Sequence, residues 1–88
     1  MIRIIFGDVF VKTSKRLPKN LHRKLVELIK ILENNPFNPL LHSKQLSGNL
    51  AGFYSFRITR EYRALFQFIE AEVVKLEKIG HRKDIYKR

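Results

Sequence analysis

The sequence predicts one α+β domain spanning residues 1–88, with the order β-α-α-β-β-β and two N-terminal helices packed on an antiparallel sheet. Three observations lead to this prediction. A chain of 88 residues has room for one hydrophobic core. In its first half, apolar residues recur at three- and four-residue steps, which is the spacing of a buried helix face. In its second half, aromatic and β-branched runs are separated by turn residues, which is the pattern of strands.

The first two predicted elements are a short strand and a short helix. Residues 2–6 form an apolar, β-branched run, and Gly7-Asp8 follows it with a sequence suited to a helix N-terminus. Phe10 and Leu17 then give the helix one narrow buried stripe. The pattern therefore predicts a strand that leads directly into a helix.

A second helix is predicted between Pro18 and Asn34. Its apolar positions recur with helical spacing, and charged residues occupy the positions between them. Pro36 ends it, because proline disfavours helical geometry in the preceding residue. The apolar stripe consists of Leu21, Leu25, Leu28, Ile29 and Leu32.

A long loop and three strands are predicted to follow. Residues 35–52 hold two of the three Pro and two of the four Gly, so we expect a surface loop, and a loop of this length is usually functional. The strand-like runs are Phe53–Thr59, Tyr62–Ile69 and Glu72–Ile79. Their short joints favour an antiparallel meander. The third run has no cleanly apolar face, which predicts a place near the edge of the sheet.

Side-chain alternation predicts the register of the first hairpin. Pairing Thr59 with Arg63 places Arg57 and Arg63 diagonally near each other on an uncovered face. Because exposed cations contribute little to folding, Arg63→Ala is expected to cost little stability. The opposite face then gathers the apolar side chains of Tyr54, Phe56, Ile58, Ala64, Phe66 and Phe68.

The chain is strongly basic. It carries 18 Lys and Arg against eight Asp and Glu, which gives a formal net charge of +10. Such a charge favours polyanions, so we expect nucleic acid or an acidic protein as the partner. Basic residues are concentrated near the C-terminus, at Lys78, Arg82, Lys83, Lys87 and Arg88.

Other classes of function are disfavoured by what the sequence lacks. It contains no Cys, which excludes a disulfide scaffold and a thiolate nucleophile. Its three His have no metal-ligand spacing, so we expect neither a metal nor a cofactor. No apolar run approaches the ~18 residues that span a bilayer, and Arg3 and Asp8 interrupt the apolar start. We therefore expect a cytoplasmic protein with no membrane partner.

Basic side chains interleaved with aromatic rings suit single-stranded RNA, because guanidinium groups clamp phosphates and rings stack on unpaired bases. Surface cations can equally be a solvated face. Cleaving RNA without a metal needs a proton acceptor, a cation for the phosphorane and a proton donor. The candidates for these tasks are Arg57, Arg63, His81, Arg82 and Tyr86. The candidates for further RNA contacts are Lys44, Phe53, Ser55, Lys78 and Lys83.

Four segments of the chain resemble the RelE/ParE superfamily of toxin–antitoxin toxins, and the RelE-type branch most. They are HSKQLSG at 42–48, GFYSFRI at 52–58, EYRALF at 61–66 and IGHRKDIY at 79–86. The resemblance implies the RelE-like α+β fold. It also implies a metal-independent endoribonuclease that cuts messenger RNA in the ribosomal A site and is held inactive by an antitoxin.

The resemblance implies a role for each matching residue. The arginine at 63 stabilises the transition-state phosphate, and the basic residue at 57 assists at the same phosphate. Arg82 contacts substrate, Tyr86 orients or stacks the RNA, and His81 lies where related toxins place Lys, His or another polar residue. Ser55 stands where the RelE pattern has a lysine, which removes a charge from the proposed active face.

Two other functions stay open at this point. A ParE-type toxin inhibits DNA gyrase on the same fold, which fold alone does not distinguish from a ribonuclease. A plain RNA-binding module would grip phosphates and cut nothing. The joint occurrence of Arg57, Arg63, Arg82 and Tyr86 favours the ribonuclease. Its expected partners are messenger RNA, the ribosome and an acidic, partly disordered antitoxin that folds on the basic face.

Overall fold

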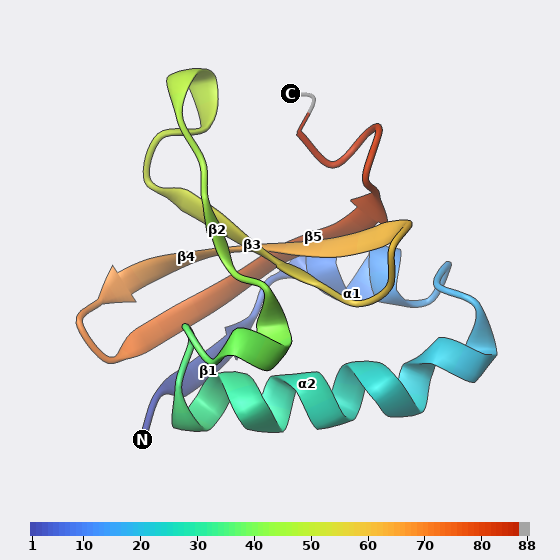
Figure 1. Ribbon diagram of the computed structural model, residues 1–88, viewed down its shortest axis with the longest axis horizontal. Helices are drawn as coiled ribbons and strands as arrows, with labels where there is room; N and C mark the ends of the chain where they lie inside the picture. The colour runs from blue at the N-terminus through green and yellow to red at the C-terminus, as the bar shows by residue number, and fades with distance from the viewer. Residues whose placement is uncertain (87–88) are drawn as a thin grey trace.

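A computed structural model describes residues 1–86 and shows a sheet with two helices on one face (Figure 1). The elements are β1 (Arg3–Phe6), α1 (Asp8–Ser14), α2 (His22–Asn34), β2 (Lys44–Gln45), β3 (Phe53–Arg57), β4 (Tyr62–Glu70) and β5 (Val73–His81). Lys87 and Arg88 of the predicted basic tail lie outside the described residues. None of the helices formed by residues 1–86 is long and apolar enough to cross a membrane.

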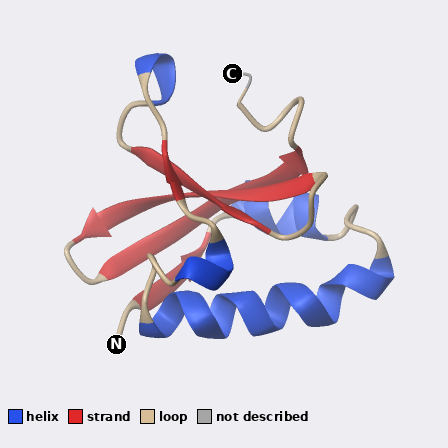
Figure 2. Ribbon diagram, viewed as in Figure 1, coloured by secondary structure: helices blue, strands red, loops and turns tan. Residues whose placement is uncertain are grey.

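The sheet has five strands in the order β1-β5-β4-β3-β2 (Figure 2). Strands β3, β4 and β5 form the predicted antiparallel meander, the unpredicted β2 adds antiparallel to β3, and β1 runs parallel to β5. The predicted α+β fold, with two helices packed on an antiparallel meander, is confirmed, and the parallel β1 makes the complete sheet mixed. The meander leaves one edge of β5 open, and β1, which precedes both helices in the chain, pairs along that edge.

Strand β5 lies next to the edge strand β1, so it is near an edge as predicted, but it is paired on both sides, with β1 and β4. A bulge explains its mixed pattern. Lys78 pairs with Leu65 and Leu76 pairs with Phe66, which leaves Glu77 as an extra residue. The bulge shifts the alternation by one residue, so that Leu76 and Ile79 both face the helices.

The register of β3 and β4 differs by two residues from the prediction. Arg57, not Thr59, pairs with Arg63. Thr59 belongs to the turn, where its hydroxyl accepts the backbone N–H groups of Glu61 and Tyr62 at 3.2 Å. A shift of two residues preserves which side chains share a face. The two arginines therefore lie directly opposite each other, on the face that was predicted.

The segment predicted as a long loop is partly structured. It contains β2, which pairs with β3 at the sheet edge, and short 3₁₀ turns at Pro39–Leu41 and Gly48–Leu50. Leu41 within it is fully buried. The segment thus runs beside β3 and brings Lys44 opposite Ser55.

Each face of the sheet carries a hydrophobic cluster. The helix side holds the main core, which includes the predicted stripe residues Phe10, Leu17, Leu25, Leu28 and Leu32. On the other face, Leu46, Leu65 and Ile85 form a small cluster, with Leu50, Phe53 and Tyr86 packed against it. The face predicted to be uncovered is therefore partly covered, because Leu65 and Phe53 point into it.

The main core supplies a stability prediction. Phe66 is fully buried, so Phe66→Ala should lower the free energy of unfolding by about 3–5 kcal/mol through the cavity it leaves. Phe37→Ala is the matched control, because that ring is 56% exposed and should cost less than half as much. Chemical denaturation measures both changes. Equal losses would contradict the placement of Phe66 in the core.

Candidate functional site

A cavity of about 430 Å³ opens on the sheet face away from the helices. Its lining, which we call the basic pocket, consists of Lys44, Arg57, Arg60, Arg63, Arg82, Lys83 and Tyr86. These residues come from β2, β3, β4, the β3–β4 turn and the segment after β5. Six of the seven are cationic, and no acidic side chain lines the pocket in the described part of the chain. An anionic ligand would offset the repulsion among these charges.

Arg63 is the most firmly held cation of the basic pocket. Its Nε donates to Ser55 Oγ at 2.9 Å, and its Nη2 donates to the His42 carbonyl at 2.8 Å and the Ser55 carbonyl at 3.3 Å. His42 adopts a left-handed backbone, with φ of 47°. Among residues 1–86, Nη1 of Arg63 has no hydrogen-bond partner. One edge of the guanidinium is thus fixed, and Nη1 is left for a ligand.

The environment of Arg63 also acts on its charge. Burial lowers the pKa of the guanidinium from its ordinary value, Tyr86 acts in the opposite direction, and Arg57 lowers the pKa again. Arginine nevertheless stays protonated, because its ordinary pKa lies far above neutral pH. The result is a permanent charge that is half-buried and poorly compensated by the protein.

Tyr86 is held from two directions. Its hydroxyl lies 3.2 Å from Ser55 Oγ, and Lys44 Nζ lies 5.7 Å from the centre of its ring, a cation–π contact. Ser55 thereby touches both Arg63 and Tyr86. The serine contributes no charge, but it lies directly beneath the charged groups.

The segment after β5 brings its cations to the basic pocket through its backbone. The Arg82 N–H donates to the Glu61 carbonyl at 2.7 Å, which ties the segment to the β3–β4 turn. Ile85 is fully buried in the small cluster. The side chains of Arg82 and Lys83 remain exposed.

Most of the predicted site residues meet in one place. Six of them line the basic pocket: Lys44, Arg57, Arg63, Arg82, Lys83 and Tyr86. Phe53 packs near Tyr86 in the small cluster, and Ser55 is buried beneath. Lys78 pairs with Leu65 and is not part of the lining. Arg60 was missed, although its place in the turn between two arginine-bearing strands could have indicated it.

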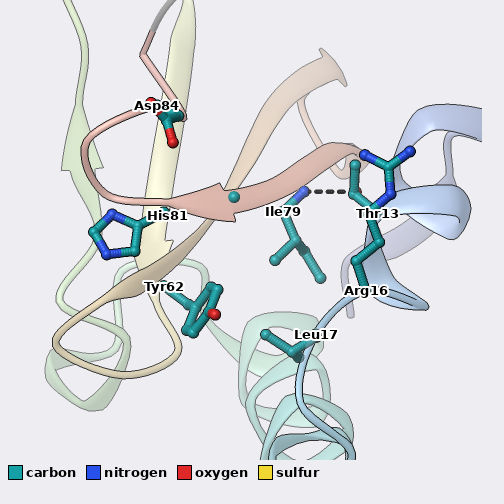
Figure 3. A pocket seen from close by; sticks show the side chains of 8 residues that line it. Thr13, Arg16, Leu17, Tyr62, Ile79, His81 and Asp84 are labelled. Carbon is teal, nitrogen blue, oxygen red and sulfur yellow. Dashed lines mark hydrogen bonds between the residues drawn. The ribbon is translucent and has the colours of Figure 1, made fainter.

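His81 lies apart from this group. It faces a cavity of about 280 Å³ on the helix side, together with Thr13, Leu17 and Tyr62 (Figure 3). Its ring meets Tyr62 edge-on at 5.9 Å, and its Nδ1 accepts the Lys83 N–H at 3.2 Å. Alternation along β5 explains the separation, because Gly80 and not His81 is opposite Arg63. A catalytic role for His81 stays a prediction.

The described part of the chain holds no set of side chains that could bind a metal ion. No three side chains of His, Cys, Asp or Glu gather there closely enough to hold a metal ion. The groups that the basic pocket offers are positive charges, amine and guanidinium donors, and one phenol. Such groups bind phosphate oxygens and stabilise negative charge that develops on them.

Solved structures of bacterial toxins share this fold. YafQ from Escherichia coli superposes with a TM-score of 0.80 at 18% identity, over 98% of this chain and 99% of that one. The toxin–antitoxin complex RelBE2 from Mycobacterium tuberculosis matches with a TM-score of 0.76 at 25% identity, over 92% and 98%. The heterotetrameric YoeB–YefM complex from Staphylococcus aureus matches with a TM-score of 0.69 at 24% identity, over 89% and 93%. No protein-family model matches the sequence, and no curated protein matches it significantly.

These similarities define the class of fold: a strand and two helices followed by a meander, as in small bacterial toxins. The chain has the fold of the RelE/ParE superfamily of toxins over nearly its whole length, which confirms the fold that the resemblance implied.

The hydrogen bonds of Arg63 revise the expected effect of removing it. Arg63→Ala should lower the free energy of unfolding by about 1–3 kcal/mol, because the buried Ser55 hydroxyl and the His42 carbonyl each lose a hydrogen-bond donor. Arg57→Ala is the control, since Arg57 is exposed and its loss removes a like charge, so stability should change by less than about 0.5 kcal/mol. Thermal and urea unfolding of both variants test this. Equal stability of the two would contradict the clamp on Arg63.

Proposed function

We propose that the protein is the toxin of a type II toxin–antitoxin system, and that it is a metal-independent endoribonuclease acting on messenger RNA at the ribosome. The observation that carries the proposal is the basic pocket, which gathers Arg57, Arg63, Arg82 and Tyr86 without an acidic side chain in the described lining. The toxins among the structural matches support the toxin assignment. Action on ribosomes places the protein in the cytoplasm.

The chemistry would be an attack by the ribose 2′-hydroxyl on the adjacent phosphorus. The new P–O bond closes a 2′,3′-cyclic phosphate, and the bond to the 5′-oxygen of the next nucleotide breaks. Negative charge grows on the non-bridging oxygens of the phosphorane. Arg63 Nη1 is available to donate to them, and its orientation is fixed beforehand by Ser55 and His42, so no reorganisation is needed. Arg57, directly opposite, adds a second charge at the same phosphate.

The same step moves two protons. The 2′-hydroxyl loses one, and the leaving 5′-oxygen gains one. Tyr86 brings a hydroxyl to the basic pocket and can serve this transfer or stack on a base. His81, the sequence candidate for proton acceptor, faces the cavity on the helix side. His81→Gln should therefore affect cleavage less than a change at Tyr86.

An acidic antitoxin is the proposed partner. The chain has a formal net charge of +10, and its basic pocket is open to solvent. RelBE2 and YoeB–YefM were crystallised as toxin–antitoxin complexes. Complementary charge speeds association and favours a partner that covers the pocket. Expression without a partner gene should arrest growth, and harmless accumulation of folded protein would contradict the toxin assignment.

Primer extension on messages from expressing cells tests the nuclease directly. Cleavage in phase with codons is the expected result. Intact messages together with supercoiling defects would instead indicate a gyrase inhibitor. RNA that is bound by the purified protein but stays uncut in the presence of ribosomes would indicate a binding module.

Arg82→Ala separates catalysis from folding. The Arg82 side chain is exposed, so the melting temperature should change little, whereas loss of a charge at the phosphate should slow cleavage by about a hundred-fold, equivalent to roughly 3 kcal/mol of barrier. Arg23→Ala is the matched control, since it removes the same charge from an exposed position of α2. RNA cleavage and growth arrest are measured for both. Full toxicity of folded Arg82→Ala would place the active face elsewhere.

A further inference from the structure

Ser55 is the one polar or charged residue that is buried within residues 1–86, with no exposed surface. It lies in the middle of β3, beside the apolar side chains of the small cluster. Burying a hydroxyl costs free energy unless it is hydrogen-bonded, and alanine would fill most of the same space. A serine at this position therefore has to be explained by its contacts.

The hydroxyl of Ser55 joins two groups that lie far apart in the sequence. Its Oγ accepts the Nε–H of Arg63 at 2.9 Å and lies 3.2 Å from the hydroxyl of Tyr86. Arg63 belongs to β4, and Tyr86 to the segment after β5. The two contacts are compatible, because a serine hydroxyl has one donor and two lone pairs.

These contacts determine how Arg63 is presented. With Nε held by Ser55 and Nη2 held by the His42 carbonyl, the plane of the guanidinium is fixed along one edge. A lysine at position 55 could not hold it in this way, since an ammonium donates hydrogen bonds and accepts none. Ser55 carries no charge of its own, but its hydroxyl accepts the hydrogen bond that orients the charged side chain of Arg63.

We propose that Ser55 is a positioning residue, which holds Arg63 and Tyr86 in one fixed arrangement around the scissile phosphate. The inference rests on the proposed ribonuclease function. It assigns Ser55 no contact with RNA. Its effect on the reaction passes through the two side chains that it touches.

The test compares Ser55→Ala with Thr13→Val. Thr13 is the matched control, because its hydroxyl also accepts a hydrogen bond, from the Ile79 N–H at 2.9 Å, but on the helix side of the sheet (Figure 3). In Ser55→Ala, kcat for RNA cleavage should fall about 10- to 100-fold with KM nearly unchanged, since misplaced groups slow chemistry to that extent. In Thr13→Val, kcat should stay at the wild-type value.

Two further readouts separate positioning from a general loss of structure. The side-chain Nε–H signal of Arg63 in NMR spectra should be protected from exchange in the wild-type protein and lose protection in Ser55→Ala. Tyr86→Phe should cost less in the Ser55→Ala background than alone, because contacting residues are not additive. If Ser55→Ala does not fold, Ser55→Cys is used with the same expectations, since a thiol is a weak acceptor.

Unchanged kcat in folded Ser55→Ala would overturn the inference while leaving the ribonuclease intact. Strict additivity with Tyr86→Phe, or an equal loss of kcat in Thr13→Val, would overturn it as well. Failure of the proposed function is distinguishable, because the wild-type protein itself would then cleave no RNA, and the inference would fall with it.

Discussion

The pairing of β3 with β4 is the constraint on which the rest of the structure depends. Because side chains alternate across a sheet, burying Phe56 and Phe66 against the helices sends Arg57 and Arg63 to the opposite face. The same register places the two cations directly across from each other. Their repulsion is tolerated because Arg63 is held by acceptors on two other segments and Arg57 reaches solvent.

On the second face of the sheet, the packing that stabilises the fold also assembles the basic pocket. The apolar side chains of Leu65 and Phe53 lie on this face, and Leu46 and Ile85 shield them from solvent. The chain segments that carry these two apolar residues also carry Lys44, Arg82, Lys83 and Tyr86 of the pocket. Figure 1 shows both segments on the side of the sheet away from α2. A small hydrophobic cluster therefore brings together charges that would otherwise separate.

The sequence predicted the elements and the faces, because helical and strand periodicities are local signals. Alternation placed Arg57 and Arg63 on one face, and the basic tail together with the resemblance of the motifs to RelE-type toxins indicated Arg82 and Tyr86. The sequence did not predict β2, which at two residues is too short to show alternation, nor the pairing of β1 with β5, which depends on contacts far apart in the chain. Burial of Ser55 and the separation of His81 from the arginines were missed, since both depend on packing after β5 and on the bulge within it.

The bulge means that β5 can lose Glu77 without a change in the strand pairing on either side of it. Without Glu77, Leu76 would still pair with Phe66 and the next residue with Leu65, so Gly80 would stay opposite Arg63. Loss of a residue after the bulge would instead bring a side chain to that place. At Gly80 even a Cβ atom would lie 3.3 Å from Ile85 Cδ1. The strand can therefore lose Glu77 and keep the same pocket, whereas a length change after it would rebuild the pocket.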